Sequence, residues 1–153
     1  MTPRLTVRRA QAGDFDAWLP LWDGYNAFYG REGPTALPLE VTLASWQRML
    51  DEAEPVWCLV AESGGSLLGL AHAVIHRSTT RIEPVCYLSD LFTAPHARGQ
   101  GIGRALIDGL CDEARQHGLR RVYWQTHTSN ATGRRLYDQV AAHQGFIVYA
   151  REL

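Results

Sequence analysis

The residues from Arg98 to Gly103 have the composition of a loop that binds phosphate groups. Glycine alternates at Gly99, Gly101 and Gly103, one arginine precedes the glycines, and an amphipathic helical pattern follows at once. Backbone amides at the start of a helix are unpaired and lie at the positive end of the helix dipole, which suits a pyrophosphate. Glycine lacks the Cβ that would hold phosphate oxygens away. The segment indicates an anion-binding loop, with a glycine-rich turn between a strand and a helix as the alternative.

Two other phosphate-binding patterns do not fit these glycines. The dinucleotide pattern GxGxxG needs a third glycine where this chain has Arg104 or Leu106, depending on the starting glycine. The Walker pattern needs Gly-Lys followed by Ser or Thr, which this loop lacks. The loop therefore belongs to neither class.

The hydrophobic pattern places the loop between a strand and a helix. The first half of the chain predicts a strand at 5–10, helices at 13–30 and 41–54, and strands at 56–62, 67–76 and 85–93. Pro20 is expected to kink or divide the first helix, and SGGS is a hairpin turn between two of the strands. The second half predicts a helix from Gly101 to His117 capped by Gly118, a strand at 121–126, a helix at 131–143 and a closing strand at 145–152.

This order of elements predicts an α+β fold. Antiparallel hairpins followed by strand–helix–strand–helix–strand imply one mixed, mostly antiparallel central sheet with helices on both faces. A chain of 153 residues suits a single domain, residues 1–153, with a core of its own.

Composition excludes several kinds of partner. A net charge of -1 gives no reason to expect nucleic acid, and no apolar stretch is long enough for a membrane span. The three cysteines, Cys58, Cys86 and Cys111, form no CxxC or Cys/His cluster, so we expect no metal and a cytoplasmic location.

The loop and a later segment together resemble a known family. Arg98-x-x-Gly101-x-Gly103, following YLSDLFTAPHA, resembles the acetyl-CoA pyrophosphate loop of the GNAT superfamily of N-acetyltransferases. VYWQTHTSNATGRRLYDQVAAHQGF resembles the family's later strand–helix region, and LTVRRAQAGDFDAW its first strand and helix. Within the superfamily, the chain looks most like the branch with spermidine/spermine and histone/polyamine-type acetyltransferases.

The resemblance implies acetyl-CoA as co-substrate and a set of residues that bind it. The pantetheine arm would lie along the strand that ends at Thr93, where a backbone N–H would stabilise the developing oxyanion. The implied cofactor-binding residues are Leu91, Phe92, Thr93, Arg98, Gly99, Gln100, Gly101, Ile102, Gly103, Arg104, Asn130 and Arg134.

Acetyl transfer to an amine also needs an acid and a base. An alkylammonium (pKa about 10, as for lysine) must lose a proton before it attacks, and the departing thiolate must gain one. Asn130, Arg134 and Tyr137 share one helix face at i, i+4 and i+7, and the resemblance implies Tyr137 as the acid. The polyamine-type relatives carry Glu-Asp where this chain has Ser89-Asp90, so Asp90 is the candidate base.

Other groups stay open for the base and for the acceptor. Tyr87, His72 and His76 are reserve bases, and a water chain is a further possibility. Asp23, Tyr25 and Tyr29 mix an acid with aromatics and are candidates to hold an ammonium.

We therefore predict transfer of acetyl from acetyl-CoA to a primary amine of a small molecule, by direct attack in a ternary complex. A protein lysine or N-terminus is an alternative acceptor, and a non-catalytic acyl-CoA-binding module is an alternative function. The resemblance also implies a homodimer, for which the apolar GFIVYAREL offers a surface.

Overall fold

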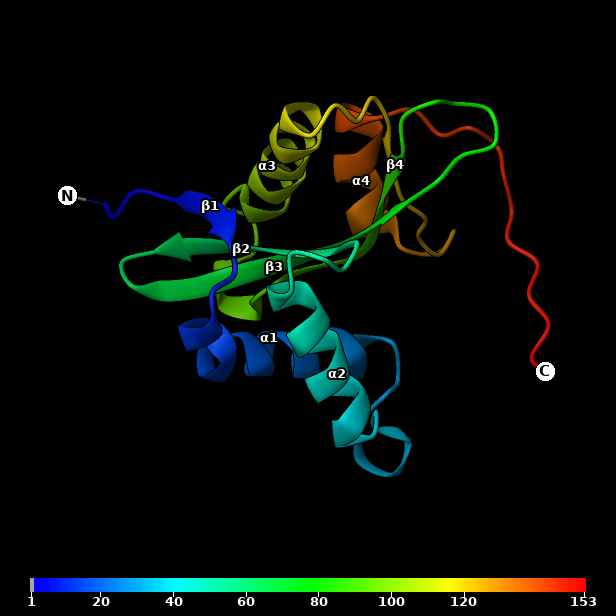
Figure 1. Cartoon of the computed structure of the whole chain (residues 1–153). Helices are drawn as coiled ribbons and strands as arrows, with labels where there is room; N and C mark the ends of the chain where they lie inside the picture. The colour runs from blue at the N-terminus through cyan, green and yellow to red at the C-terminus, as the bar shows by residue number, and fades with distance from the viewer. Residues whose placement is uncertain (1) are drawn as a thin grey trace.

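A central sheet lies between two helical layers (Figure 1). The computed structural model describes residues 2–153. The strands are β1 (Thr6–Arg9), β2 (Val56–Ser63), β3 (Ser66–His76), β4 (Val85–Thr93) and β5 (Val122–Tyr123), and the helices are α1 (Phe15–Phe28), α2 (Leu39–Leu50), α3 (Ile102–Gln116) and α4 (Ala131–Val140). Short 3₁₀ turns lie at Ala12–Asp14, Gly33–Thr35 and Pro95–Ala97. Helices α1 and α2 cover one face of the sheet, and α3 and α4 the other (Figure 1).

The sheet is mixed and mostly antiparallel, as the sequence predicts. Its strand order is β1-β2-β3-β4-β5, with antiparallel neighbours except for the parallel pair β4 and β5. Gly64 and Gly65 turn the chain between β2 and β3 with φ of +59° and +80°. Two positive φ values in a two-residue hairpin favour glycine at both positions. The predicted α+β class with helices on both faces is confirmed.

The core differs in character on the two faces of the sheet. Beneath α1 it is aromatic: Trp18 is fully buried, stacks on Trp22 with ring centroids 6.0 Å apart, and meets Trp46 at 4.6 Å. Beneath α3 it is aliphatic, with Leu106 and Leu110 fully buried. Burying such side chains contributes about 1.5–3 kcal/mol each. The aromatic side holds the polar groups described below.

Two predicted strands differ from the structure, and the first helix is continuous where the sequence allowed a division at Pro20. Helix α1 is not divided but runs through Pro20, because a proline there removes one amide donor while the aromatic face of the helix stays buried. The closing strand predicted at 145–152 is wrong, and the strand predicted at 121–126 shortens to Val122–Tyr123. After α4 the chain runs away from the sheet (Figure 1), so in the described protomer no neighbouring strand pairs with residues 145–152.

Candidate active site

The loop between β4 and α3 has the backbone that its glycines predict. Gly99 and Gly101 have φ of +76° and +79°, in the left-handed region, and Gly101 is the N-cap of α3. No heavy atom of the described chain lies within 4 Å of the position that a Cβ would take at either residue. The loop surface is therefore open, and glycine keeps its backbone accessible to a ligand.

The first amides of α3 are free to bind an anion. Within residues 2–153, no backbone carbonyl accepts a hydrogen bond from Ile102, Gly103 or Arg104. Arg104 and Arg98 are both exposed beside this loop, and Arg98 Nε donates to the Thr93 carbonyl at 3.4 Å. Unpaired amides, the positive end of the α3 dipole and two guanidinium groups fit the diphosphate of CoA.

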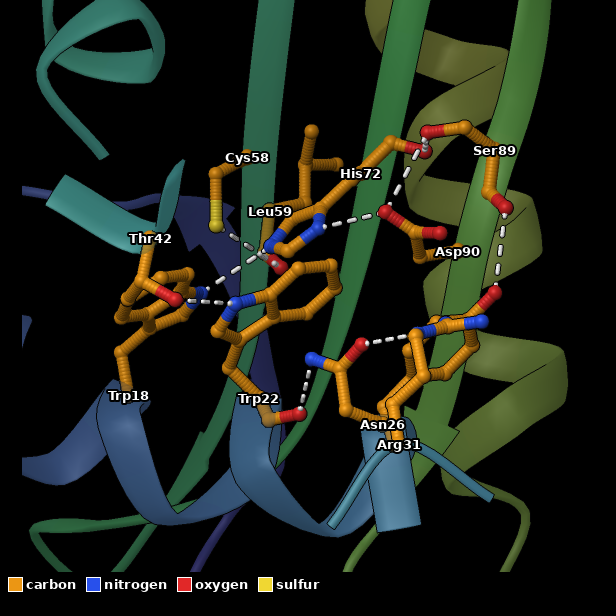
Figure 2. A network of polar contacts seen from close by, with 11 residues as sticks. Trp18, Trp22, Asn26, Arg31, Thr42, Cys58, Leu59, His72, Ser89 and Asp90 are labelled. Carbon is orange, nitrogen blue, oxygen red and sulfur yellow. Dashed lines mark hydrogen bonds and ion pairs between the residues drawn. The ribbon is translucent and has the colours of Figure 1, made fainter. Parts of the chain in front are cut away.

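Strand β4 contains a β-bulge shortly before this loop. His72 on β3 pairs with Asp90, whereas its neighbour Ala73 pairs with Leu88, so Ser89 is the extra residue on β4. A bulge re-aims the side chains that follow it. Here it sets Asp90 opposite His72, on the α1 side of the sheet (Figure 2).

The outer edge of β4 is free beyond the bulge. After Tyr87, no strand of the described chain pairs with this edge. The amide of Ala94 donates to the Leu68 carbonyl, toward β3, at 2.8 Å. Because backbone groups alternate in direction along a strand, Leu91 and Thr93 direct theirs toward the free edge. A linear ligand that carries amide groups can pair there as an added strand does.

A buried relay of hydrogen bonds connects α1 to Asp90 (Figure 2). Trp18 Nε1 donates to His72 Nε2 at 3.0 Å, and His72 Nδ1 lies 2.9 Å from Asp90 Oδ2. An indole N–H can only donate, so His72 Nε2 accepts and Nδ1 carries the proton that it donates to Asp90. The His72 side chain is 1% exposed and that of Asp90 19%. The relay fixes the Asp90 carboxylate at the edge of the core.

Two further groups surround this carboxylate. Ser89 Oγ lies 3.4 Å from Asp90 Oδ2 and donates to the His72 carbonyl at 3.2 Å. Tyr25 donates from its hydroxyl to the Ser89 carbonyl at 3.4 Å. Burial, and next the negative charge of Asp90, raise the pKa of Tyr25 far above its usual range. The tyrosine therefore stays a phenol beside the carboxylate.

The relay and similar contacts occupy the two reserve histidines. His72 has no free nitrogen lone pair, because Trp18 donates to it. His76 Nδ1 donates to the Arg77 carbonyl at 2.8 Å, and Nε2 lies 2.7 Å from the Tyr123 hydroxyl. Both imidazoles are engaged in structural hydrogen bonds, and burial raises the pKa of Tyr87 above its ordinary value. Among the candidate side chains, Asp90 therefore stays the first choice for the base.

The predicted acid, Tyr137, is a half-buried side chain of α4. Its ring meets the edge of Trp124 with centroids 5.5 Å apart. Burial, and next the neighbouring Tyr29, raise the pKa of Tyr137 above its ordinary value. A raised pKa keeps the hydroxyl protonated at neutral pH, as a proton donor requires.

Asn130 and Arg134 have structural contacts at the start of α4. Asn130 is the N-cap: its Oδ1 accepts from the Gly133 amide at 3.2 Å, and its Nδ2 donates to Thr126 Oγ1 at 2.9 Å. Arg134 Nη1 donates to the Thr128 carbonyl at 2.9 Å. These contacts order the turn that leads into α4, and the roles of both side chains toward CoA stay predictions.

The three predicted acceptor residues, near the end of α1, differ in how exposed they are. Tyr25 is buried, Tyr29 is 38% exposed, and their rings lie 5.0 Å apart. Asp23 is exposed and has no hydrogen bond to another described residue. A cavity of about 500 Å³ opens beside Tyr29, between the end of α1 and the start of α4, lined by Phe28, Tyr29, His127, Ser129, Asn130, Ala131 and Thr132. Its volume is in the range of small-molecule sites.

Sequence reasoning missed the role of Trp18. The indole does pack in the core, yet its N–H also fixes His72, 54 positions later in the chain. No short-range pattern links the two residues. A buried Trp needs a hydrogen-bond partner, but only the fold reveals which one.

The loop, the free strand edge and the partly buried Asp90 carboxylate follow one another along β4 and the start of α3. The chain matches the description "Acetyltransferase (GNAT) family" over residues 18–142. It is 31% identical over 150 residues to the D-amino-acid N-acetyltransferase HPA3 of Saccharomyces cerevisiae, covering 97% of this chain and 91% of that protein. It is 31% identical over 147 residues to the N-acetyltransferase YhfO of Bacillus subtilis, covering 95% of each chain.

A solved structure shares the whole fold. The aminoglycoside N-acetyltransferase AAC(6')-Iy, solved with a bisubstrate analogue that contains CoA, superposes with a TM-score of 0.84 at 19% identity, covering 98% of this chain and 99% of that one. The chain belongs to the GNAT family and is an acetyltransferase that uses acetyl-CoA.

Neither a metal centre nor a membrane span is part of the described structure. Residues 2–153 contain no group of three or more His, Cys, Asp or Glu side chains arranged to hold an ion. Among the helices of the same residues, none has the length and apolar character needed to cross a bilayer.

Replacing Gly101 by alanine tests whether the loop between β4 and α3 binds CoA. At φ of +79° an alanine costs about 1–2 kcal/mol of unfolding free energy, and its methyl group also covers the exposed amides. We expect Gly101→Ala to weaken CoA binding about tenfold or more, measured by titration calorimetry.

Gly118→Ala is the matched control. Gly118 has φ of +76°, equally open surroundings and a position at the far end of α3. It should lose similar stability in chemical denaturation and keep full CoA affinity. Equal CoA binding by both variants would contradict the assignment of the loop.

Proposed function

We propose that this acetyltransferase transfers acetyl from acetyl-CoA to the primary amine of a small molecule, by direct attack in a ternary complex. The observation that carries the proposal is the position of Asp90. The carboxylate is fixed by the His72 relay where the free edge of β4 begins. A carbonyl group bound along that edge would lie close to a group that can accept a proton.

The residues of the chain would divide the work of the transfer. Asp90 holds the ammonium of the acceptor and accepts its proton, directly or through water. A backbone N–H on the free edge, from Leu91 or Thr93, stabilises the oxyanion as the C–N bond forms. The Tyr137 hydroxyl gives its proton to the sulfur as the C–S bond breaks. The nitrogen loses its second proton as the intermediate collapses, and this proton restores the Tyr137 hydroxyl through solvent. The net products are an N-acetyl amine, a free thiol and the proton first taken by Asp90.

Several features favour a small acceptor. The cavity of about 500 Å³ beside Tyr29 has the size of a small-molecule site. One relative is named for D-amino acids and one structural neighbour for aminoglycosides, and both kinds of acceptor are small amines. A polyamine-type acceptor has less support, because the described lining of this cavity contains no carboxylate.

A thiol-release assay tests the proposed function. The protein is given acetyl-CoA with D- and L-amino acids, aminoglycosides, polyamines or lysine peptides, and free thiol is measured. We expect release with at least one small amine. Release with lysine peptides alone would instead indicate a protein acceptor, and CoA binding without release across the panel would indicate a non-catalytic module.

Tyr137→Phe tests the proton donor in the same assay. The hydroxyl has no hydrogen-bond partner in residues 2–153, so its removal should leave the fold and the KM for acetyl-CoA unchanged. We expect kcat to fall about 10²–10⁴-fold, the usual contribution of a general acid. Tyr149→Phe is the control, because it removes a phenol hydroxyl outside the proposed active site and keeps the apolar ring of the C-terminal segment. Unchanged turnover in Tyr137→Phe would remove the assignment.

We also propose a homodimer that forms through residues 146–153. This segment begins with four consecutive large apolar residues, Phe146 to Tyr149, and leaves the body of the protein after α4 (Figure 1). Phe146 is 84% exposed and Val148 66%. A cavity of about 580 Å³ between α3, β5 and α4 has apolar side chains that include Ile107, Val122, Trp124 and Val140. The segment of a second copy would add to the edge at β5 and cover this cavity.

A cytoplasmic location, which the three free thiols favour, is part of the same proposal.

Light scattering after size-exclusion chromatography tests the dimer. We expect twice the mass of the 17.1 kDa chain, and the mass of one chain for the double variant Phe146→Asp, Val148→Asp. Ile82→Asp is the control, because Ile82 is also apolar and 94% exposed but lies in the loop between β3 and β4. A single-chain mass for the unmodified protein would contradict the proposal.

A further inference from the structure

Arg31 is a cation fixed beside the candidate acceptor site. It follows α1, and its Nε donates to Asn26 Oδ1 at 2.7 Å. Asn26 is 4% exposed and is itself held by a bond from its Nδ2 to the Trp22 carbonyl at 2.9 Å. Figure 2 shows Arg31 and Asn26 in one series of contacts with Trp22 and Thr42, beside the separate relay that contains Asp90. The buried Asn26 amide therefore orients the guanidinium through its Nε.

The outer nitrogens of this guanidinium are available to a ligand. Arg31 is half-buried, and among residues 2–153 neither Nη1 nor Nη2 has a hydrogen-bond acceptor or a carboxylate partner. Two other half-buried arginines, Arg8 and Arg9, differ from Arg31 because each is paired with an acidic side chain at 3.0 Å or less. An oriented guanidinium with free outer N–H groups fits a carboxylate in two-point geometry.

The Arg31 guanidinium lies close to the rings of two tyrosines, Tyr25 and Tyr29. The guanidinium carbon lies 5.9 Å from the centre of the Tyr25 ring and 5.5 Å from that of Tyr29. Tyr29 lines the cavity of about 500 Å³. Burial is the main cause of the raised pKa of Tyr25, but Asp90 raises this pKa further and Arg31 lowers it. The opposite charges of Arg31 and Asp90 thus act on the same hydroxyl.

We propose that Arg31 binds a carboxylate of the acceptor, so that the acceptor is an amino acid whose ammonium faces Asp90 and whose carboxylate faces Arg31. The inference rests on the proposed acetyl transfer to a small amine and names its substrate class. A polyamine would bring a second ammonium toward a guanidinium, which repels it. A zwitterion complements both charges.

Matched substrate pairs test the inference. Each pair is an amino acid and the amine that lacks its carboxylate: alanine with ethylamine, leucine with isoamylamine, and phenylalanine with phenethylamine, in both D and L forms of the acid. The thiol-release assay gives kcat/KM for the unmodified protein, Arg31→Gln, Arg31→Lys and the control Arg48→Gln, which changes an exposed arginine of α2. Comparing variants on one substrate cancels differences in amine basicity.

We expect the unmodified protein to prefer the amino acid in at least one pair. Arg31→Gln should lower kcat/KM for that amino acid about a hundredfold, mostly through KM, and leave the matched amine unchanged or improved. For the same amino acid, Arg31→Lys should have a kcat/KM about tenfold higher than that of Arg31→Gln, because lysine keeps the charge without the two-point geometry. Arg48→Gln should behave as the unmodified protein does.

Two results would overturn the inference, and they are distinguishable. If the unmodified protein acetylates amines but shows no preference for the acid, or if Arg31→Gln lowers both members of a pair equally, Arg31 is not a carboxylate site while the proposed function stands. If none of the amines tested causes thiol release, the proposed function is overturned together with this inference.

Discussion

The hydrogen bond from the Trp18 indole to His72 constrains the rest of the site. An indole N–H can only donate, so it sets which imidazole nitrogen accepts and which one donates. The donating nitrogen then holds Asp90, the one acidic group of the relay. The relay lies in a buried aromatic core, where an unpaired polar group costs about 1–3 kcal/mol. Packing and hydrogen bonding therefore enforce the same arrangement.

The sheet supplies the second half of the site through a local irregularity. The extra residue at Ser89 sets Asp90 opposite His72, and the parallel pairing of β4 with β5 extends over only two residue pairs. The strand beyond therefore keeps unpaired backbone groups, and it ends at a loop whose amides are free. One continuous backbone segment thus combines an unpaired strand edge with a helix start whose amides are free, where we propose that the amide-containing arm of the cofactor and its diphosphate bind.

The sequence predicted the parts of this arrangement that depend on local spacing. The glycines at 99 and 101, the strand before them and the helix after them were all readable, because positive φ and hydrophobic periodicity are local properties. The sequence did not predict the relay, because Trp18, His72 and Asp90 come into contact only when α1, β3 and β4 pack together. The strand predicted at 145–152 is wrong for a related reason: a run of β-branched and aromatic residues shows that a segment can pair as a strand, but not whether a partner strand is available in the same chain.

The tautomer of His72 is the most direct test of this account. Nitrogen chemical shifts of the imidazole, measured by NMR at pH 7 on the full chain and assigned with a His72→Gln variant, distinguish the two neutral forms and the cation. The account predicts a proton on Nδ1 and none on Nε2, with this preference lost in Trp18→Phe. A protonated Nε2 in the unmodified protein would contradict it, since the Trp18 indole would then have no acceptor and Asp90 would be held by some other means.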